Sequence, residues 1–163
     1  MERAEKVLKF YTLCNTLKDV VRTGWKNWNV NRERIESVAE HVYGVQMLAF
    51  GIYSEYKDEY KDLDFEKVIM MLAIHELEET VIGDFTFYEI TKEEKNAKGH
   101  AAVAKILKDL ANSDYIKEII EEFDARQTNE AKFAYFAINL SAMFNANFMM
   151  NKSVLMWTFK QTT

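Results

Sequence analysis

The chain has 163 residues and a formal net charge of −5; 48% of its residues are apolar and 29% are charged. Such a composition supports a folded domain with a sizeable core and excludes a disordered polar tract or a collagen-like protein. We expect a single domain over residues 1–163. The acidic balance argues against a partner that is polymeric nucleic acid, although it permits a small basic pocket for one phosphate.

Cysteine usage and apolar runs indicate the compartment. Cys14 is the only cysteine, so an internal disulfide is impossible and a reducing compartment is favoured. Residues 1–6 are charged where a secretory signal peptide would become apolar. The longest apolar run, Val68 to Ile74, is shorter than the roughly 20 residues of a membrane span. We therefore expect a cytoplasmic protein with no membrane partner.

The predicted elements in the first third of the chain are helices. The absence of proline favours helices joined by short connections. Apolar residues recur at helical spacing over 3–21, and the pattern then lapses over 22–36, which we interpret as an ordered loop. Ser37 stands three residues before Glu40, a capping-box pattern that predicts a helix to about Tyr56.

The helical pattern continues through the rest of the chain. After a solvated turn over 57–63, Asp64 can cap a helix that reaches His75, and a break follows near Gly83. The remaining predicted helices run from Thr91 to Leu110, from Asp114 to about Phe123, and from Thr128 or Asn129 to about Met150. No period-two strand is evident. We predict an all-α fold, a single-domain bundle of about six helices.

The end of the chain differs in composition from the rest. The stretch from Phe133 to Thr163 contains only two charged side chains, Lys152 and Lys160. A helix that is apolar on nearly every side is either central in the core or covered by a partner subunit. We expect core or dimer packing here rather than a ligand groove, and we predict a homodimer.

Two of the three histidines are candidates for chemistry. His41 lies in the first turn of its predicted helix, and His75 lies near a helix end. Neutral imidazoles and carboxylates are standard ligands of transition metals. The spacing leaves two interpretations open, a metal or acid–base site and an acidic helix end. The carboxylates that follow His75 are Glu76, Glu78, Glu79 and Asp84.

The other reactive side chains give weaker evidence of a catalytic or ligand-binding role. We interpret His100 as a surface or packing residue, and Cys14 as a buried core thiol on an apolar stripe. For Lys92 and Lys95 two interpretations stay open, a contribution to holding a phosphate and a solvated helix start, of which we favour the second. The sequence contains no glycine-rich phosphate loop, no nucleophile elbow and no zinc-finger spacing. A serine or cysteine hydrolase is therefore not supported.

Five segments occur in an order that is typical of a known family. They are Arg22–Trp25 (RTGW), Arg34–His41 (RIESVAEH), His75–Asp84 (HELEETVIGD), Ile90–Lys95 (ITKEEK) and Glu130–Phe133 (EAKF). Together they resemble the HD-domain phosphohydrolase superfamily, most closely its 5′-deoxynucleotidase-like branch. The resemblance spans roughly residues 10–148 and implies the all-α HD-domain fold.

The resemblance also implies a cofactor and a substrate. The cofactor is a divalent metal (Mn, Co, Zn, Fe or Mg), and the substrate is a nucleoside 5′-monophosphate or a similar small phosphomonoester. His41, His75 and Glu76 match the metal-binding positions. Glu79 matches a glutamate that helps to activate water, and Asp84 matches an aspartate near the substrate.

The remaining correspondences concern substrate binding and two departures from the family pattern. Arg22 matches a phosphate-contacting arginine, and Trp25 falls near an aromatic residue that borders the sugar. The dyad aspartate is Glu76 here, which keeps the charge but adds a methylene. The family's distal aspartate falls on Ile138, which cannot coordinate a metal. An alternative is therefore a catalytically impaired HD domain that binds a nucleotide or a protein partner.

Overall fold

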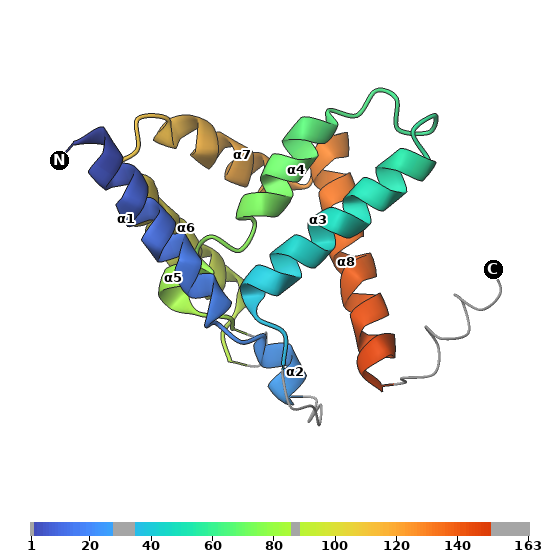
Figure 1. Cartoon of the computed structure of the whole chain (residues 1–163), viewed down its shortest axis with the longest axis horizontal. Coiled ribbons are helices and arrows are strands. Elements are labelled where there is room, and N and C mark those ends of the chain that lie inside the picture. The colour runs from blue at the N-terminus through green and yellow to red at the C-terminus, as the bar shows by residue number, and fades with distance from the viewer. Residues whose placement is uncertain (1, 28–34, 86–88, 151–163) are drawn as a thin grey trace.

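The computed structural model describes residues 2–27, 35–85 and 89–150, and these residues pack as helices (Figure 1). The all-α prediction is confirmed: in the described ranges, the β-type pairing is limited to one isolated antiparallel bridge between Val21 and Ser37. The elements are α1 (Arg3–Asn15), a short 3₁₀ helix (Thr16–Lys18), α2 (Thr23–Asn27), α3 (Val38–Glu55), α4 (Phe65–Ile74), α5 (Glu79–Ile82), α6 (Lys92–Leu107), α7 (Ser113–Ala125) and α8 (Asn129–Met150).

Three of the longer helices, α3, α4 and α6, begin at the predicted caps. The Ser37 hydroxyl accepts a hydrogen bond from the backbone N–H of Glu40 at 3.3 Å, and the Glu40 carboxylate accepts one from the backbone N–H of Ser37 at 2.9 Å. Thr91 and Glu94 form the same reciprocal pair at the start of α6. Asp64 caps α4 through its side chain. Each cap satisfies backbone donors that have no partner within the helix.

Two short helices were not predicted. The interpretation of 22–36 as a loop is wrong at its start, where α2 covers Thr23–Asn27; residues 28–34 lie outside the described ranges. The single turn of α5 lies just before the predicted break, where Gly83 adopts a φ of 78°. A left-handed φ suits glycine because it has no Cβ. One-turn helices carry too little periodicity to be recognised in a sequence.

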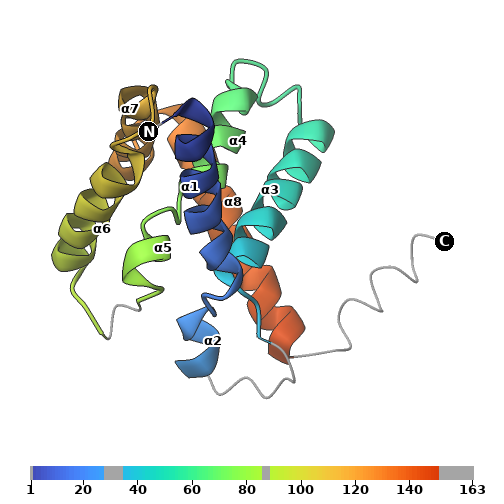
Figure 2. The ribbon, with the colours of Figure 1, turned by 60° about the vertical axis from the view of Figure 1, so that its left-hand side comes forward.

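The core places α4 among three other long helices. Figures 1 and 2 show α4 beside α3 and α8, and α4 also contacts α7. The main cluster of buried side chains comes from these four helices and contains Val45, Ala49, Val68, Met71, Leu72, Ile119, Phe123, Ala131, Phe133, Ala134 and Ala137. Because α4 is held on several sides, the residues at its C-terminal end have fixed positions.

A second cluster connects α6 and α7 to α1. Leu77, Val103, Ile106, Leu107 and Ile120 are its buried members. Helix α1 covers this cluster from outside and has no fully buried residue. Cys14 is accordingly half-buried rather than enclosed in the core as predicted.

Helix α8 has both an inward and an outward apolar face. Phe133, Ala134 and Ala137 are buried, whereas Met143 and Phe144 are more than half exposed. The prediction of core packing is therefore confirmed for one face; the rest of the charge-poor stretch, residues 151–163, lies outside the described ranges. None of the helices in the described ranges has the length and apolar character that a membrane span requires.

Candidate metal centre

Three predicted ligands converge from two parts of the chain. His41 lies in the first turn of α3, His75 directly follows α4, and Glu76 is the next residue. Each offers a ligand atom, and the three atoms lie within 4.8 Å of one another. The Oε1 atom of Glu76 is 3.8 Å from Nε2 of His41 and 3.6 Å from Nε2 of His75. The capped start of α3 and the packed end of α4 bring these residues together.

The three residues fit a divalent cation. The Nε2 atoms of His41 and His75 are both buried and have no hydrogen-bond partner. Nδ1 of His75 lies 2.8 Å from the carbonyl oxygen of Leu72, which can only accept, so Nδ1 carries the proton and Nε2 presents a lone pair. Two atoms bound to one zinc-like ion at tetrahedral angles lie about 3.4 Å apart. The separations from Glu76 are close to that value.

The protonation states also suit coordination. Burial lowers the pKa of His41 to about 3, and the neighbouring Arg22 acts in the same direction. Burial also lowers the pKa of His75. Both rings are therefore neutral, the form that binds metals. Burial by itself would raise the pKa of Glu76, but nearby positive charge, including that of Arg22 and Lys95, outweighs it, so the pKa is lowered and the carboxylate is ionised.

Arg22 lies against the metal cluster. Its Nη1 donates a hydrogen bond to Oε1 of Glu76 at 3.1 Å. Its backbone N–H donates to the carbonyl oxygen of Glu36 at 3.0 Å, which ties the segment before α2 to the segment before α3. The predicted phosphate-contacting cation is thus held beside the predicted metal ligands by its own backbone.

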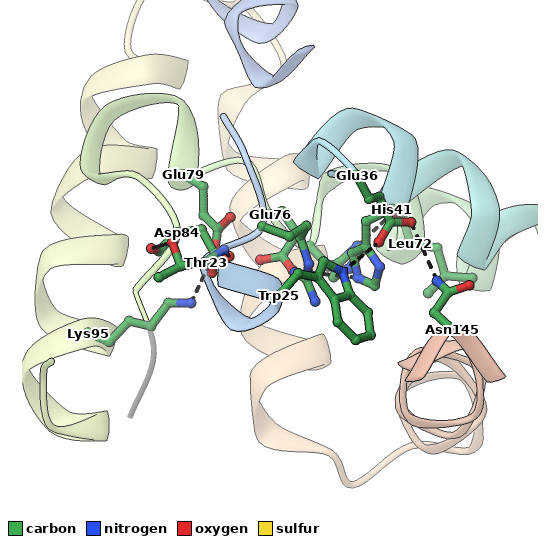
Figure 3. Close-up of polar contacts among 12 residues, drawn as sticks. Thr23, Trp25, Glu36, His41, Leu72, Glu76, Glu79, Asp84, Lys95 and Asn145 are labelled. Atoms are coloured by element: carbon green, nitrogen blue, oxygen red, sulfur yellow. Dashed lines mark hydrogen bonds and ion pairs between the residues drawn. The ribbon is translucent and has the colours of Figure 1, made fainter. Parts of the chain in front are cut away.

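Glu79 and Lys95 form an ion pair on the other side of Glu76 (Figure 3). Glu79 is 1% exposed, and Nζ of Lys95 donates to its Oε1 at 3.1 Å. The second oxygen, Oε2, is buried without a partner. Burial raises the pKa of Glu79, and the carboxylates of Glu76 and Asp84 add to that effect while Lys95 opposes it. The interpretation of Lys95 as part of a solvated helix start is therefore wrong.

Asp84 fastens α2 to the turn that follows α5. Its Oδ2 accepts a hydrogen bond from the backbone N–H of Thr23 at 2.7 Å, and the Thr23 hydroxyl donates to the Asp84 carbonyl oxygen at 2.7 Å. In Figure 3, Thr23 and Asp84 lie next to each other on the Lys95 side of the site. Asp84 thereby positions the residue next to Arg22.

Trp25 and Glu36 form the opposite side of the site. The indole Nε1 of Trp25 donates to Oε2 of Glu36 at 3.1 Å, and Asn145 of α8 donates to Oε1 of Glu36 at 3.4 Å. Trp25 is only 7% exposed in the described part of the chain. Burial raises the pKa of Glu36, and the hydrogen bond from Trp25 opposes that shift. Glu36 connects α2 to α8 across the predicted substrate side.

Neither Ile138 nor His100 contributes to the ligand cluster found among the described residues. Ile138 is half-buried and packs against the main apolar core. The described part of α8 has no acidic residue after Glu130, and Glu130 accepts from the backbone N–H of Asp64. His100 is exposed and lies 2.9 Å from Asp124, in agreement with the prediction of a surface residue.

Sequence reasoning missed four residues that hold the site. Thr23, Glu36 and Lys95 all lie within the family-like segments, so their place in those motifs was a usable signal. Asn145 lies beyond every such segment, and only the approach of α8 reveals its contact with Glu36.

Comparison with known proteins identifies the family. A sequence profile of the HD domain matches residues 14–157. The chain is 35% identical over 129 residues to the 5′-deoxynucleotidase HDDC2 of Dictyostelium discoideum, covering 76% of this chain and 67% of that protein. It is 34% identical over 134 residues to human 5′-deoxynucleotidase HDDC2, covering 80% of this chain and 61% of that protein. The chain therefore belongs to the HD domain family, and it spans between three-fifths and two-thirds of these relatives' length.

Solved structures share the fold. A conserved hypothetical protein from Pyrococcus furiosus superposes with a TM-score of 0.76 at 26% identity, covering 90% of this chain and 84% of that one. A protein from Magnetospirillum magnetotacticum, described as a predicted metal-dependent phosphohydrolase, gives a TM-score of 0.73 at 25% identity and covers 91% of this chain and 72% of that one. Membership of this family implies a divalent metal, in line with the ligand cluster.

Proposed function

We propose that this protein is a metal-dependent phosphohydrolase that hydrolyses a nucleoside 5′-monophosphate or a similar small phosphomonoester. The relatives named 5′-deoxynucleotidase and the neighbour described as a metal-dependent phosphohydrolase support this activity. The observation that carries the proposal is the meeting of two unpartnered buried imidazole nitrogens with a carboxylate and an arginine.

In this proposal His41, His75 and Glu76 hold the divalent metal. When bound, the ion would lower the pKa of a water toward ~7 and neutralise phosphoryl oxygens. Of Mn, Co, Zn, Fe and Mg, we expect one of the first four, because imidazole ligands suit them better than Mg.

In this proposal the other side chains bind the substrate or transfer protons. Oε2 of Glu79 is an unpaired acceptor and takes a proton from the attacking water as its oxygen bonds to phosphorus. The ester P–O bond then breaks, and the proton held by Glu79 passes to the leaving alkoxide, which departs as the alcohol. Arg22 offers a planar fork to the phosphate. Trp25 borders the sugar, and Asp84 acts near the substrate by holding the segment that carries Arg22.

A phosphate-release assay tests this function. Purified protein should release phosphate from deoxynucleoside 5′-monophosphates when Mn²⁺ or Co²⁺ is added, and His75→Ala should reduce the rate to background because it removes a ligand. Lys9→Gln, which alters an exposed ion pair with Asp109, is the control and should retain the rate. Absence of metal-dependent release across all four bases would refute the proposed activity.

One observation favours a second candidate function. Ile138 packs in the apolar core where the family pattern has a metal-binding aspartate, and this supports a catalytically impaired HD domain that binds a nucleotide or a protein partner. That candidate predicts nucleotide binding without turnover, which isothermal titration calorimetry on the same protein would detect.

Two further expectations stay predictions. They are a cytoplasmic location and a homodimer. The single-domain organisation over residues 1–163 is likewise still a prediction. The exposed apolar side chains of α8 support the homodimer, because such side chains are often covered by a partner subunit.

A further inference from the structure

Two carboxylates beside the candidate metal site, Glu76 and Glu79, each have a cation as their partner. Glu76, the one carboxylate of the ligand cluster, accepts from Arg22 at 3.1 Å. Glu79, three residues after Glu76 in the chain, accepts from Lys95 at 3.1 Å. The two histidine ligands are neutral. The ligand cluster therefore has a single anionic ligand, and that ligand is paired with a cation, although a divalent ion is held most strongly by uncompensated anionic ligands.

The arginine and the ligand cluster compete for one atom. Oε1 of Glu76 is the oxygen that faces Nε2 of both histidines, and it is the same oxygen that accepts from Nη1 of Arg22. Arg22 is 22% exposed at its side chain, and Glu76 is 12% exposed, so this attraction is only partly screened by water. An ion that binds Oε1 must share this oxygen with the guanidinium or displace it.

The protein also supplies only three ligands among its described residues. The group of candidate ligand atoms is limited to His41, His75 and Glu76 in the part of the chain that the structure describes. Helix α8 packs against α3 and α4, but Ile138 fills its core-facing side with hydrocarbon. We take the fourth ligand to be a water or a bound anion, as in many three-ligand sites.

From these contacts we infer that the metal and the substrate's phosphate bind cooperatively, with Arg22 as the switch between the two states. This inference rests on the proposed function for the identity of the anion. Without phosphate, Arg22 neutralises Glu76 and weakens the metal site. A phosphate dianion draws the guanidinium to itself, frees the charge of Glu76 and offers an oxygen as the missing ligand. Arg22 is thus a positioning residue for the metal as well as a contact for phosphate.

Equilibrium dialysis of Mn²⁺ measures this coupling without any turnover. The full chain is dialysed against Mn²⁺ with inorganic phosphate, or with chloride at matched ionic strength, and bound metal is taken as the difference from a protein-free chamber. We expect phosphate to tighten the binding of Mn²⁺ by about 10-fold, within the range of ordinary coupling between two sites. Mn²⁺ should tighten the binding of phosphate by the same factor, because such coupling is reciprocal.

The decisive variant is Arg22→Gln in the absence of phosphate. The variant keeps the backbone contact with Glu36 but loses the guanidinium charge beside Glu76. Mn²⁺ should therefore bind several-fold more tightly than in the wild type. A residue that only contacts phosphate would leave this affinity unchanged. Lys9→Gln removes the same charge from a distant exposed pair and should bind Mn²⁺ as the wild type does.

Each outcome is informative. Equal Mn²⁺ affinity with and without phosphate in the wild type overturns the inference, and so does an Arg22→Gln variant that binds Mn²⁺ no more tightly than the wild type. The wild-type comparison needs no substitution, so a variant that fails to fold does not remove the test. If coupling is present but no phosphomonoester is hydrolysed, the inference stands and the proposed activity fails.

Discussion

At the scale of single residues, the Glu79–Lys95 pair is the clearest example of a contact that shapes the site. The Glu79 carboxylate is fully enclosed, and a buried charge without a partner is strongly unfavourable. Lys95 is that partner, because its Nζ donates to Oε1 of Glu79. Oε2 is then the one oxygen of this carboxylate without a hydrogen bond. In the proposed reaction, this arrangement determines which oxygen can accept a proton from water.

Removing the lysine charge should therefore destabilise the protein. We expect Lys95→Met to lower the free energy of unfolding by about 3 kcal/mol, because it leaves a buried carboxylate unpaired. Lys95→Arg should lose much less, and Glu79→Gln combined with Lys95→Met should recover most of the loss. Urea denaturation of the four proteins measures these differences. A double variant that is no more stable than Lys95→Met would show that the two residues do not act as a pair.

At the scale of elements, the caps of the helices determine where the ligands stand. The capping box of Ser37 and Glu40 begins α3 one turn before His41, so it sets the orientation of that histidine. At the other side of the site, the contacts between Thr23 and Asp84 hold α2 against the turn after α5. Short helices have little stability of their own, so such tertiary contacts decide whether they form.

The cap of α3 offers a test at this scale. Ser37→Ala should lower the free energy of unfolding by about 1 kcal/mol, because a backbone donor loses its partner. It should also weaken the binding of Mn²⁺, since the turn that carries His41 frays. Thr91→Ala removes the matching cap of α6 and should affect stability alone. Chemical denaturation and equilibrium dialysis provide the two measurements; equal loss of Mn²⁺ affinity in both variants would contradict this link.

At the scale of the whole molecule, the packing around α4 supports the site. Met71 and Leu72 have no exposed surface, and both lie in the last turns of α4, just before His75. The four-helix cluster that encloses them fixes the end of this helix. The outer faces of α1 and α8 carry large apolar side chains that remain exposed, so part of the apolar surface of these helices is not buried in the core.

A cavity in the core should be far more costly than the loss of a surface side chain. We expect Met71→Ala to lower the free energy of unfolding by about 3 kcal/mol, the sum of lost burial and a residual cavity. Leu8→Ala, at a side chain that is 63% exposed, should change it by less than about 0.5 kcal/mol. Thermal or urea unfolding would measure both, and similar losses in the two variants would contradict this assignment of the core.

The exposed face of α8 leads to a prediction about assembly. We expect a homodimer, and Met143→Glu combined with Phe144→Glu should convert it to a monomer by placing two charges in the interface. Tyr115→Glu, at another exposed apolar residue on α7, should leave the dimer intact. Sedimentation equilibrium gives the mass of each protein. A monomeric wild type, or a dimer that survives both glutamates, would contradict the prediction.

The sequence by itself determined the helical fold, because periodicity and capping boxes are local signals that a chain carries without reference to its partners. It also indicated His41, His75 and Glu76 as ligands, through motifs whose order resembles the family. Their chemistry could be read from the sequence, but the approach of their ligand atoms to within 4.8 Å could not, since 33 residues of chain lie between the two histidines.

Only the tertiary structure decided which charges are paired and buried. Lys95 lies in a helix start that is ordinarily solvated, and it becomes the half-buried partner of an enclosed carboxylate only because α6 approaches α5. Arg22 meets Glu76 because the segment before α2, which the bridge between Val21 and Ser37 pairs with the start of α3, lies beside the end of α4. Burial and charge pairing depend on contacts between elements far apart in the chain. These contacts determine the protonation and the charge pairing of the candidate metal ligands.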